Sequence, residues 1–291
     1  MSEKLPRIIG RTEELEELRS RAQQAGIVGF DTESNGFYAY HERLCLLQLQ
    51  VEQSTFLVDP QAFAEPEGLQ PLLHLLADPR IVKISHGAEF DVLALKRELA
   101  TSLRGLFDTM RTASLLKEPG LSLDKLVLRH FGVRLDKSYQ RFDWGRRPLP
   151  PKALEYAARD VQYLLPLHQL LGRGLEEKKL ISRATIEFAK VERMTPKPRV
   201  FDPTGYRRLR GWAQLDGPSR EALGRLFFVR EEIARRADVA PFRVLNTETL
   251  LRLAQLRPAT PRELAATHGL PGWLLPRYEA QLLAALARTI A

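Results

Sequence analysis

The sequence predicts an α/β domain with a mixed sheet flanked by helices, followed by a smaller domain that is all helical. In the first two thirds of the 291 residues, short apolar runs alternate with stretches of helical periodicity. From Asp202 onward only helical patterns remain, separated by Gly, Pro, Asn and Asp. All eleven lysines lie at or before Lys197, whereas the region from Asp202 onward has fourteen arginines and no lysine.

The first element is a helix over residues 12–25, because Leu15, Leu18, Ala22 and Ala25 fall on one face. Short apolar runs bounded by polar or turn-forming residues then predict strands at 27–33, 43–51, 55–58, 81–85 and 106–108. Helical periodicity predicts helices at 69–77 and 88–99 and through most of 109–179, including one continuous helix over 151–171. Early hairpin strands followed by βαβ units favour a mixed sheet.

The second region is expected to be a helical bundle, and its helices are predicted at 205–215, 219–238, 246–254, 261–267 and 276–290. A proline-bearing stretch around Pro196 and Pro198 marks a linker between the two regions. The predicted domains are therefore 1–194 and 202–291, with the linker at 195–201.

The composition limits what the protein can be. A net charge of +8 and a sequence pI near 9.7 favour a polyanionic partner such as nucleic acid, although many basic proteins have none. The single cysteine, Cys45, can form neither an internal disulfide nor a cysteine-based zinc site. There is no signal-peptide core and no apolar stretch of membrane-spanning length, so we expect a cytoplasmic protein without a membrane partner.

The triplet Asp31-Thr32-Glu33 ends a predicted strand, and the period of two places both carboxylates on one face. Two like charges held together are costly unless a cation lies between them. An exposed strand end with two solvated acids is the alternative, because this triplet is common by chance.

Two further motifs carry acids. Asp91 lies early in a predicted helix, where the helix dipole alone would favour an acid, and His86 either contacts phosphate or ends the preceding strand. Tyr156 and Asp160 are four residues apart on a predicted helix and therefore share a face. An exposed Tyr–Asp pair, with Arg159 neutralising the acid, is the bland alternative.

Taken together, the motifs indicate a metal-dependent phosphodiesterase. Carboxylate oxygens suit Mg²⁺ or Mn²⁺, and two such ions can hold the attacking and leaving oxygens of an in-line displacement. Tyr156, with an ordinary pKa near ~10, is a poor base, so we expect it to orient the attacking water.

The order Asp-x-Glu, His-bearing Asp motif and Tyr-x-x-x-Asp resembles the three exonuclease motifs of the DEDD superfamily of 3′–5′ exonucleases, tyrosine subclass. The segments 135–144, 147–156 and 164–167 resemble the ribonuclease D family, and the resemblance covers residues 8–190. It implies a ribonuclease H-like exonuclease fold and hydrolysis of single-stranded 3′ ends to nucleoside monophosphates. Residues 209–212, 237–245, 250–253 and 262–264 resemble the HRDC domain, a helical nucleic-acid-binding module.

The resemblance implies that Asp31, Glu33, Asp91 and Asp160 bind two divalent ions and that Tyr156 acts with them. We expect the substrate to be contacted by residues near these motifs, namely Thr32, His86, Lys137, Gln140, Arg141 and Trp144. For Trp144 the alternative is that it fills core space, and for Lys137 that it is a solvated cation.

The sequence therefore predicts a cytoplasmic, metal-dependent 3′–5′ exoribonuclease that trims structured RNAs, foremost tRNA precursors. Two alternatives stay open: a DNA exonuclease in repair, and a catalytically silent nucleic-acid-binding adaptor. The distinction between RNA and DNA depends on a 2′-hydroxyl contact. The natural RNA, the oligomeric state, the processivity and the need for the helical domain are left open by the sequence.

Overall fold

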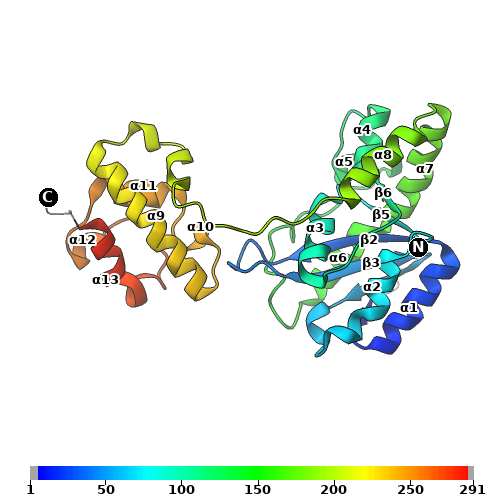
Figure 1. Ribbon diagram of the computed structural model, residues 1–291, viewed down its shortest axis with the longest axis horizontal. Coiled ribbons are helices and arrows are strands. Elements are labelled where there is room, and N and C mark those ends of the chain that lie inside the picture. The colour runs from blue at the N-terminus through cyan, green and yellow to red at the C-terminus, as the bar shows by residue number, and fades with distance from the viewer. Residues whose placement is uncertain (1–5, 288–291) are drawn as a thin grey trace. The chain divides into compact units, whose positions relative to one another are not determined.

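The computed structural model describes residues 6–287 and divides into two compact units (Figure 1). The first unit comprises the chain up to Asn35 together with Arg43–Lys197, and the second comprises Gly36–Glu42 together with the chain from Pro198 onward. The domain limits proposed from the sequence stay predictions, and their outermost residues lie outside the described range.

The first unit contains a six-stranded mixed sheet in the order β1-β4-β3-β2-β5-β6. Strands β2, β3, β5 and β6 are labelled in Figure 1. Its strands are β1 (Arg7–Ile9), β2 (Ile27–Ser34), β3 (Leu44–Val51), β4 (Ser54–Val58), β5 (Val82–Ser85) and β6 (Leu106–Asp108). Strands β2, β3 and β4 are antiparallel neighbours, whereas β2, β5 and β6 run parallel, as does the pair β1 and β4. The carboxyl ends of β2, β5 and β6 therefore meet at one edge of the sheet.

The expected mixed sheet flanked by helices is confirmed. The helices of this unit are α1 (Thr12–Ala25), α2 (Gln70–Ala77), α3 (Glu89–Leu99), α4 (Thr109–Leu116), α5 (Leu123–Phe131), α6 (Pro151–Gln162), α7 (Leu164–Glu177) and α8 (Ile181–Glu192). Two short 3₁₀ helices, η1 (Pro60–Ala62) and η2 (Pro66–Leu69), precede α2. The three-residue strand β1 is not among the strands predicted from the sequence.

The single helix expected over 151–171 is wrong, because the chain breaks at Tyr163 between α6 and α7. Pro166 is the physical reason, since a proline inside a continuous helix removes a backbone hydrogen bond and clashes with the preceding turn. In the first turn of a new helix the missing N–H has no intrahelical partner to lose. The break leaves α6 as a separate helix that contacts β2, β3 and β4.

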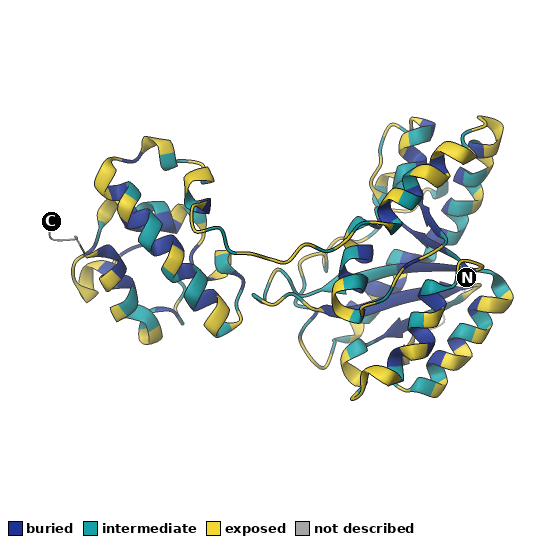
Figure 2. Ribbon diagram, in the orientation of Figure 1, coloured by how far each residue is buried: buried dark blue, intermediate teal, exposed yellow. Residues whose placement is uncertain are grey.

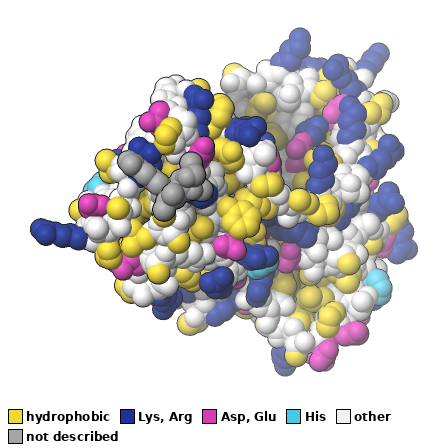
Figure 3. Space-filling view, turned by 60° about the vertical axis from the view of Figure 1, so that its left-hand side comes forward, with side chains coloured by type: hydrophobic (Ala, Val, Ile, Leu, Met, Phe, Trp, Pro, Cys, Tyr) yellow, Lys and Arg dark blue, Asp and Glu magenta, His cyan; other side chains and the backbone are white. Residues whose placement is uncertain are grey.

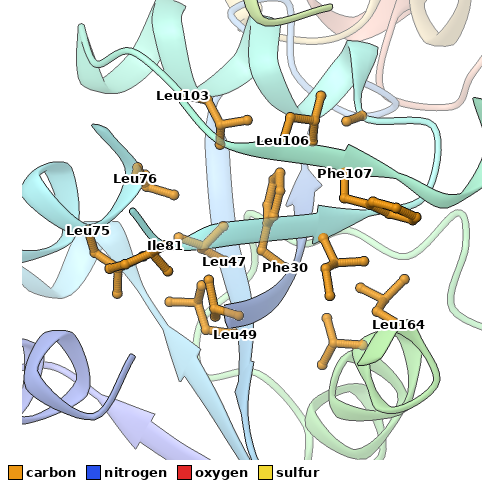
Figure 4. Close-up of a cluster of buried hydrophobic side chains, with 14 of the residues drawn as sticks. Phe30, Leu47, Leu49, Leu75, Leu76, Ile81, Leu103, Leu106, Phe107 and Leu164 are labelled. Atoms are coloured by element: carbon orange, nitrogen blue, oxygen red, sulfur yellow. The ribbon is translucent and has the colours of Figure 1, made fainter. Parts of the chain in front are cut away.

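The core of the first unit lies on the sheet. Buried side chains from β2 and β3, including Phe30, Leu47 and Leu49, meet side chains from the helices and from Ile81 (Figure 4). In Figure 2 much of the sheet is buried, β3 throughout, whereas the helices also carry exposed residues. A smaller cluster under α6 contains Leu46, Leu57, Trp144, Tyr156 and Ala157. It supports the tyrosine of the third motif from below.

The second unit is helical, as expected. It contains η3 (Gly205–Arg208), η4 (Trp212–Gln214), α9 (Gly217–Ala237), α10 (Pro241–Val244), α11 (Thr247–Leu256), α12 (Pro261–Ala265) and α13 (Leu275–Leu286). The α-helix predicted over 205–215 is wrong, because Gly211 has φ 106° and divides that stretch into two 3₁₀ helices. Of the helix predicted over 276–290, residues 288–290 lie outside the described residues.

Basic side chains are widely distributed over the surface. Figure 3 shows Lys and Arg side chains projecting at many points of the face that it draws. Within residues 6–287, no helix is both long enough and apolar enough to span a lipid bilayer.

Candidate active site

The parallel strands bring the first two motifs to the same edge of the sheet. Asp31 and Glu33 lie in the second half of β2, and Asp91 lies in the first turn of α3, which follows β5. Because β2 and β5 are hydrogen-bonded neighbours, their carboxyl ends present these acids next to each other. Helix α6 crosses β2, β3 and β4 and adds Tyr156 and Asp160 from above.

These residues surround one cavity of about 450 Å³. Of the residues predicted for the site, eight line this cavity: Asp31, Thr32, Glu33, His86, Lys137, Gln140, Tyr156 and Asp160. Asp91 is not part of the cavity lining, and its exposed fraction is 6%. Its two carboxylate oxygens accept hydrogen bonds from Thr32 Oγ1, at 2.5 Å, and from Ser85 Oγ, at 3.0 Å.

Burial makes the four carboxylates hard to ionise, and repulsion within the set adds to this effect for Asp31 and Glu33. Burial, followed by the charges of Asp91 and Asp160, holds the pKa of Asp31 well above its ordinary value. The pKa of Glu33 is raised by burial and then by the charge of Asp31. Burial also raises the pKa of Asp91 to about 6 and that of Asp160 to about 7. The ionised carboxylates are therefore unfavourable here unless a positive charge stabilises them.

A divalent cation would relieve this repulsion, and the donor set fits one. All four side chains offer carboxylate oxygens, which are the ligands that Mg²⁺ and Mn²⁺ prefer. Among the described residues, however, no three His, Cys, Asp or Glu side chains are already arranged to hold an ion. The carboxylate chemistry of the cavity fits such cations.

The Tyr156 hydroxyl donates a hydrogen bond to the Asp160 carboxylate. Burial, together with the charges of Asp160 and Glu33, raises the pKa of Tyr156 above its ordinary value. The hydroxyl therefore remains protonated, so it can donate a hydrogen bond but cannot serve as a base. This agrees with the role expected for Tyr156, which is to orient a water.

Asp108 shapes the second motif, and the sequence argument missed it. This buried carboxylate, at the end of β6, accepts hydrogen bonds from the backbone N–H groups of Gly87, Ala88, Met110 and Arg111 at 2.9–3.1 Å. It thereby caps α4 and holds the turn that leads into α3. The signal that could have found it is an Asp at a strand end directly before a predicted helix.

His86 lies in this turn and faces the cavity. Its Nδ1 contacts Thr109 Oγ1 at 2.9 Å, and its buried Nε2 has no partner among the described residues. Burial lowers the pKa of His86, which favours the neutral imidazole. The unpaired Nε2 is suited to a substrate contact, so the phosphate-contact interpretation stays a prediction.

Lys137 and Gln140 lie on an irregular segment at the cavity wall. Lys137 Nζ forms an ion pair with Asp124 Oδ2 at 2.7 Å, and this contact lowers the pKa of Asp124. An incoming phosphate would therefore compete with Asp124 for the lysine. Arg141 is exposed and lies outside the cavity lining.

Trp144 does not offer the base-stacking surface expected of it, because the side chain is only 1% exposed. Its ring centroid lies 6.2 Å from that of Tyr156 and 5.2 Å from that of Phe142. Arg147 fixes the segment around it through bonds to Asp59 and to the Trp144 carbonyl. Trp144 therefore fills core space behind the tyrosine, as the alternative interpretation held.

Comparison with known proteins shows which families the two units resemble. Residues 6–176 match a 3′–5′ exonuclease family and residues 219–286 match the HRDC domain. Ribonuclease D from Desulfotalea psychrophila is 30% identical over 89% of this chain and 69% of its own length. An exosome complex component 10 homolog from Caenorhabditis elegans is 32% identical over 86% of the chain, which spans only 29% of that relative.

Among solved structures, Escherichia coli RNase D superposes with a TM-score of 0.69 and 28% identity, over 97% of this chain and 74% of its own. That protein is described as an exoribonuclease involved in structured RNA processing.

Proposed function

This chain belongs to the ribonuclease D family of 3′–5′ exonucleases, and we infer from its site that it removes nucleotides stepwise from RNA 3′ ends in a cation-dependent reaction. The observation that carries this inference is the cavity of about 450 Å³, into which β2 and α6 direct acidic side chains above the buried Asp91. Burial raises the pKa values of Asp31 and Glu33, so a bound cation would be needed to stabilise their ionised forms.

The family generally depends on divalent metal, and two ions, Mg²⁺ or Mn²⁺, are proposed for this chain. Bound cations would supply an activated water and stabilise charge on the phosphate oxygens. Asp31, Glu33, Asp91 and Asp160 would hold them. The Tyr156 hydroxyl would aim the attacking water at the terminal phosphodiester, because it stays protonated next to Asp160.

The remaining lining residues would position the RNA strand. The neutral His86 imidazole would donate to or accept from the terminal nucleotide through Nε2. Lys137 would exchange its partner Asp124 for a phosphate, and Gln140 would add an uncharged polar contact. Thr32 would act mainly by holding Asp91 through its hydroxyl.

We propose structured RNAs with single-stranded 3′ ends, foremost tRNA precursors, as substrates, and the cytoplasm as the site of action. The net charge of +8 supports a nucleic-acid partner, because each phosphate contact releases counterions. The relatives support RNA over DNA, since one is named ribonuclease D and another is an exosome component.

The test is digestion of matched RNA and DNA oligomers labelled at the 3′ end, with Mn²⁺ or with a chelator. The proposal predicts that the full chain releases labelled mononucleotide from RNA only when Mn²⁺ is present. Faster release from DNA would favour the repair exonuclease. Tight RNA binding without cleavage, under every metal condition, would favour the adaptor.

A further inference from the structure

Gln48, in the middle of β3, is a buried polar side chain without a visible structural reason. Its exposed fraction is 0%, and neither its Oε1 nor its Nε2 has a hydrogen-bond partner among the described residues. A buried amide without a hydrogen-bond partner destabilises the fold, so such groups are rare in native proteins. An apolar side chain of similar volume would avoid this cost.

The register places Gln48 beside the first catalytic motif. It lies directly opposite Asp31 in β2 and opposite Leu57 in β4. Residues directly opposite in an antiparallel pair share a face and have Cβ atoms about 5 Å apart. The Gln48 amide is therefore within reach of the Asp31 carboxylate.

The neighbours of Gln48 confirm which face it occupies. Leu46, two residues earlier in β3, and the opposite Leu57 both belong to the cluster that packs under Tyr156. Helix α6 contacts all three strands at this point. Gln48 thus lies in the floor of the site, under the helix that carries Asp160.

Gln50, two residues further along β3, offers an internal comparison. It is also buried, at 8% exposure, and it shares the face of Gln48. Its Nε2 donates to the carbonyl of Glu52 at 3.3 Å, and its opposite residue in β2 is Gly29. The amide without any partner is the one that lies opposite a catalytic carboxylate.

We propose that Gln48 is a positioning residue for the cation site, whose amide N–H donates to the Asp31 carboxylate when that carboxylate binds metal. The inference rests on the metal dependence proposed above. Carboxylate ligands in metal sites are themselves held by hydrogen bonds, and loss of such a partner typically lowers metal affinity about 10–100-fold.

The experiment is a calorimetric titration of the RNA-free full chain with Mn²⁺, comparing wild type with Gln48→Met and Gln50→Met. Methionine keeps the length of the side chain and removes the amide. We expect Gln48→Met to weaken Mn²⁺ binding about 10–100-fold, with metal-free thermal stability unchanged or higher. Gln50→Met should bind Mn²⁺ as the wild type does.

Equal Mn²⁺ affinity in wild type and Gln48→Met would overturn the inference while leaving the proposed function intact. Equal weakening in both variants would also overturn it, because that result indicates a general disturbance of β3. A wild-type chain that binds no Mn²⁺ would overturn the proposed function and this inference with it.

A second measurement uses the wild-type chain and is independent of how the variants fold. In protein labelled with ¹⁵N-glutamine, the side-chain amide of Gln48 should shift and exchange more slowly on addition of Mg²⁺. The amide of Gln50 serves as the internal control and should shift less. An unchanged Gln48 signal under saturating Mg²⁺ would contradict the proposal.

Discussion

The two units of this chain use charge in opposite ways. The exonuclease unit buries acids at fixed positions, where burial and then the charges of Asp91 and Asp160 raise the pKa of Asp31. The helical unit carries fourteen arginines against nine acids from Asp202 onward, a net charge of +5, and most of its ion pairs are exposed. Even Arg230, buried at 9% exposure, lies over the ring of Phe227 without a carboxylate partner at hydrogen-bond distance among the described residues.

Hydrolysis by the exonuclease unit therefore depends on the exact positions of a few carboxylates. RNA affinity of the helical unit depends instead on how many basic side chains its surface carries. A cation site fails when one carboxylate is lost, because each ligand has a defined geometry. A basic surface loses affinity gradually, since each phosphate contact contributes a similar increment. Substitutions in the two units should therefore differ both in magnitude and in kind.

The largest expected effect is the loss of one carboxylate. Asp31→Asn or Asp160→Asn should lower the hydrolysis rate by ~10³-fold or more, because a lost metal ligand removes several kcal/mol of transition-state stabilisation. The fold should survive, since the substitution also removes a repulsive charge. Steady-state digestion and circular dichroism measure both. A folded Asp31→Asn variant of near-wild-type activity would contradict the role of Asp31 as a metal ligand. The contrast between the two units would then be lost.

A smaller effect is expected from the tyrosine. Tyr156→Phe should lower turnover by about 10²-fold, within the range for groups that handle or position protons. RNA affinity should change little, because the ring and its packing on Trp144 remain. Kinetics at saturating RNA, together with a binding isotherm, separate the two quantities. Lost binding with preserved turnover would make Tyr156 a substrate contact.

Loss of the helical unit should lower RNA affinity without abolishing hydrolysis. A fragment ending within 195–199 retains all five predicted catalytic residues and should still cleave short single strands. It should bind longer structured RNA more weakly and with a shallower salt dependence, because arginine contacts are lost. A salt titration of RNA affinity for both proteins measures this. Identical slopes would assign the helical unit to protein contacts instead of RNA.

The smallest effect concerns pH and the metal-free protein. The pKa of Asp160 is raised to about 7, whereas the unfolded chain titrates near the ordinary value of ~4. The contribution of Asp160 to the free energy of unfolding is therefore fully present below the unfolded pKa. It is lost as the pH rises through the folded pKa of about 7. Denaturant unfolding at several pH values should show this decline, with a weaker decline in Asp160→Asn. An equal decline in both proteins would mean that other groups cause it.

Much of the exonuclease unit could be predicted from the sequence, because its strands and motifs are local patterns. Asp31, Tyr156 and Asp160 each belong to a short motif with a readable period. Gln48 could not be found in this way, since its role depends on a partner that only the sheet brings near. Asp108 has a local capping signal, but its bonds to Gly87 and Ala88 also depend on the neighbouring strands.

Three predictions from the sequence were wrong, one because of packing and two because of local backbone effects. Trp144 lies among predicted substrate contacts, yet the Tyr156 cluster buries it. The helix expected over 151–171 ignored the effect of Pro166, and the one expected over 205–215 ignored Gly211. Pro166 and Gly211 act on the local backbone, whereas only packing between distant segments decides that Trp144 is buried.

The most direct test of the cation site is anomalous scattering from crystals of the full chain grown with Mn²⁺. The account predicts Mn²⁺ peaks inside the cavity bounded by Asp31, Glu33 and Asp160, with Asp91 completing the ligand set. Crystals of Asp31→Asn, grown under the same conditions, should lose or weaken these peaks. Peaks confined to other surfaces, or a cavity without peaks at saturating Mn²⁺, would contradict the account.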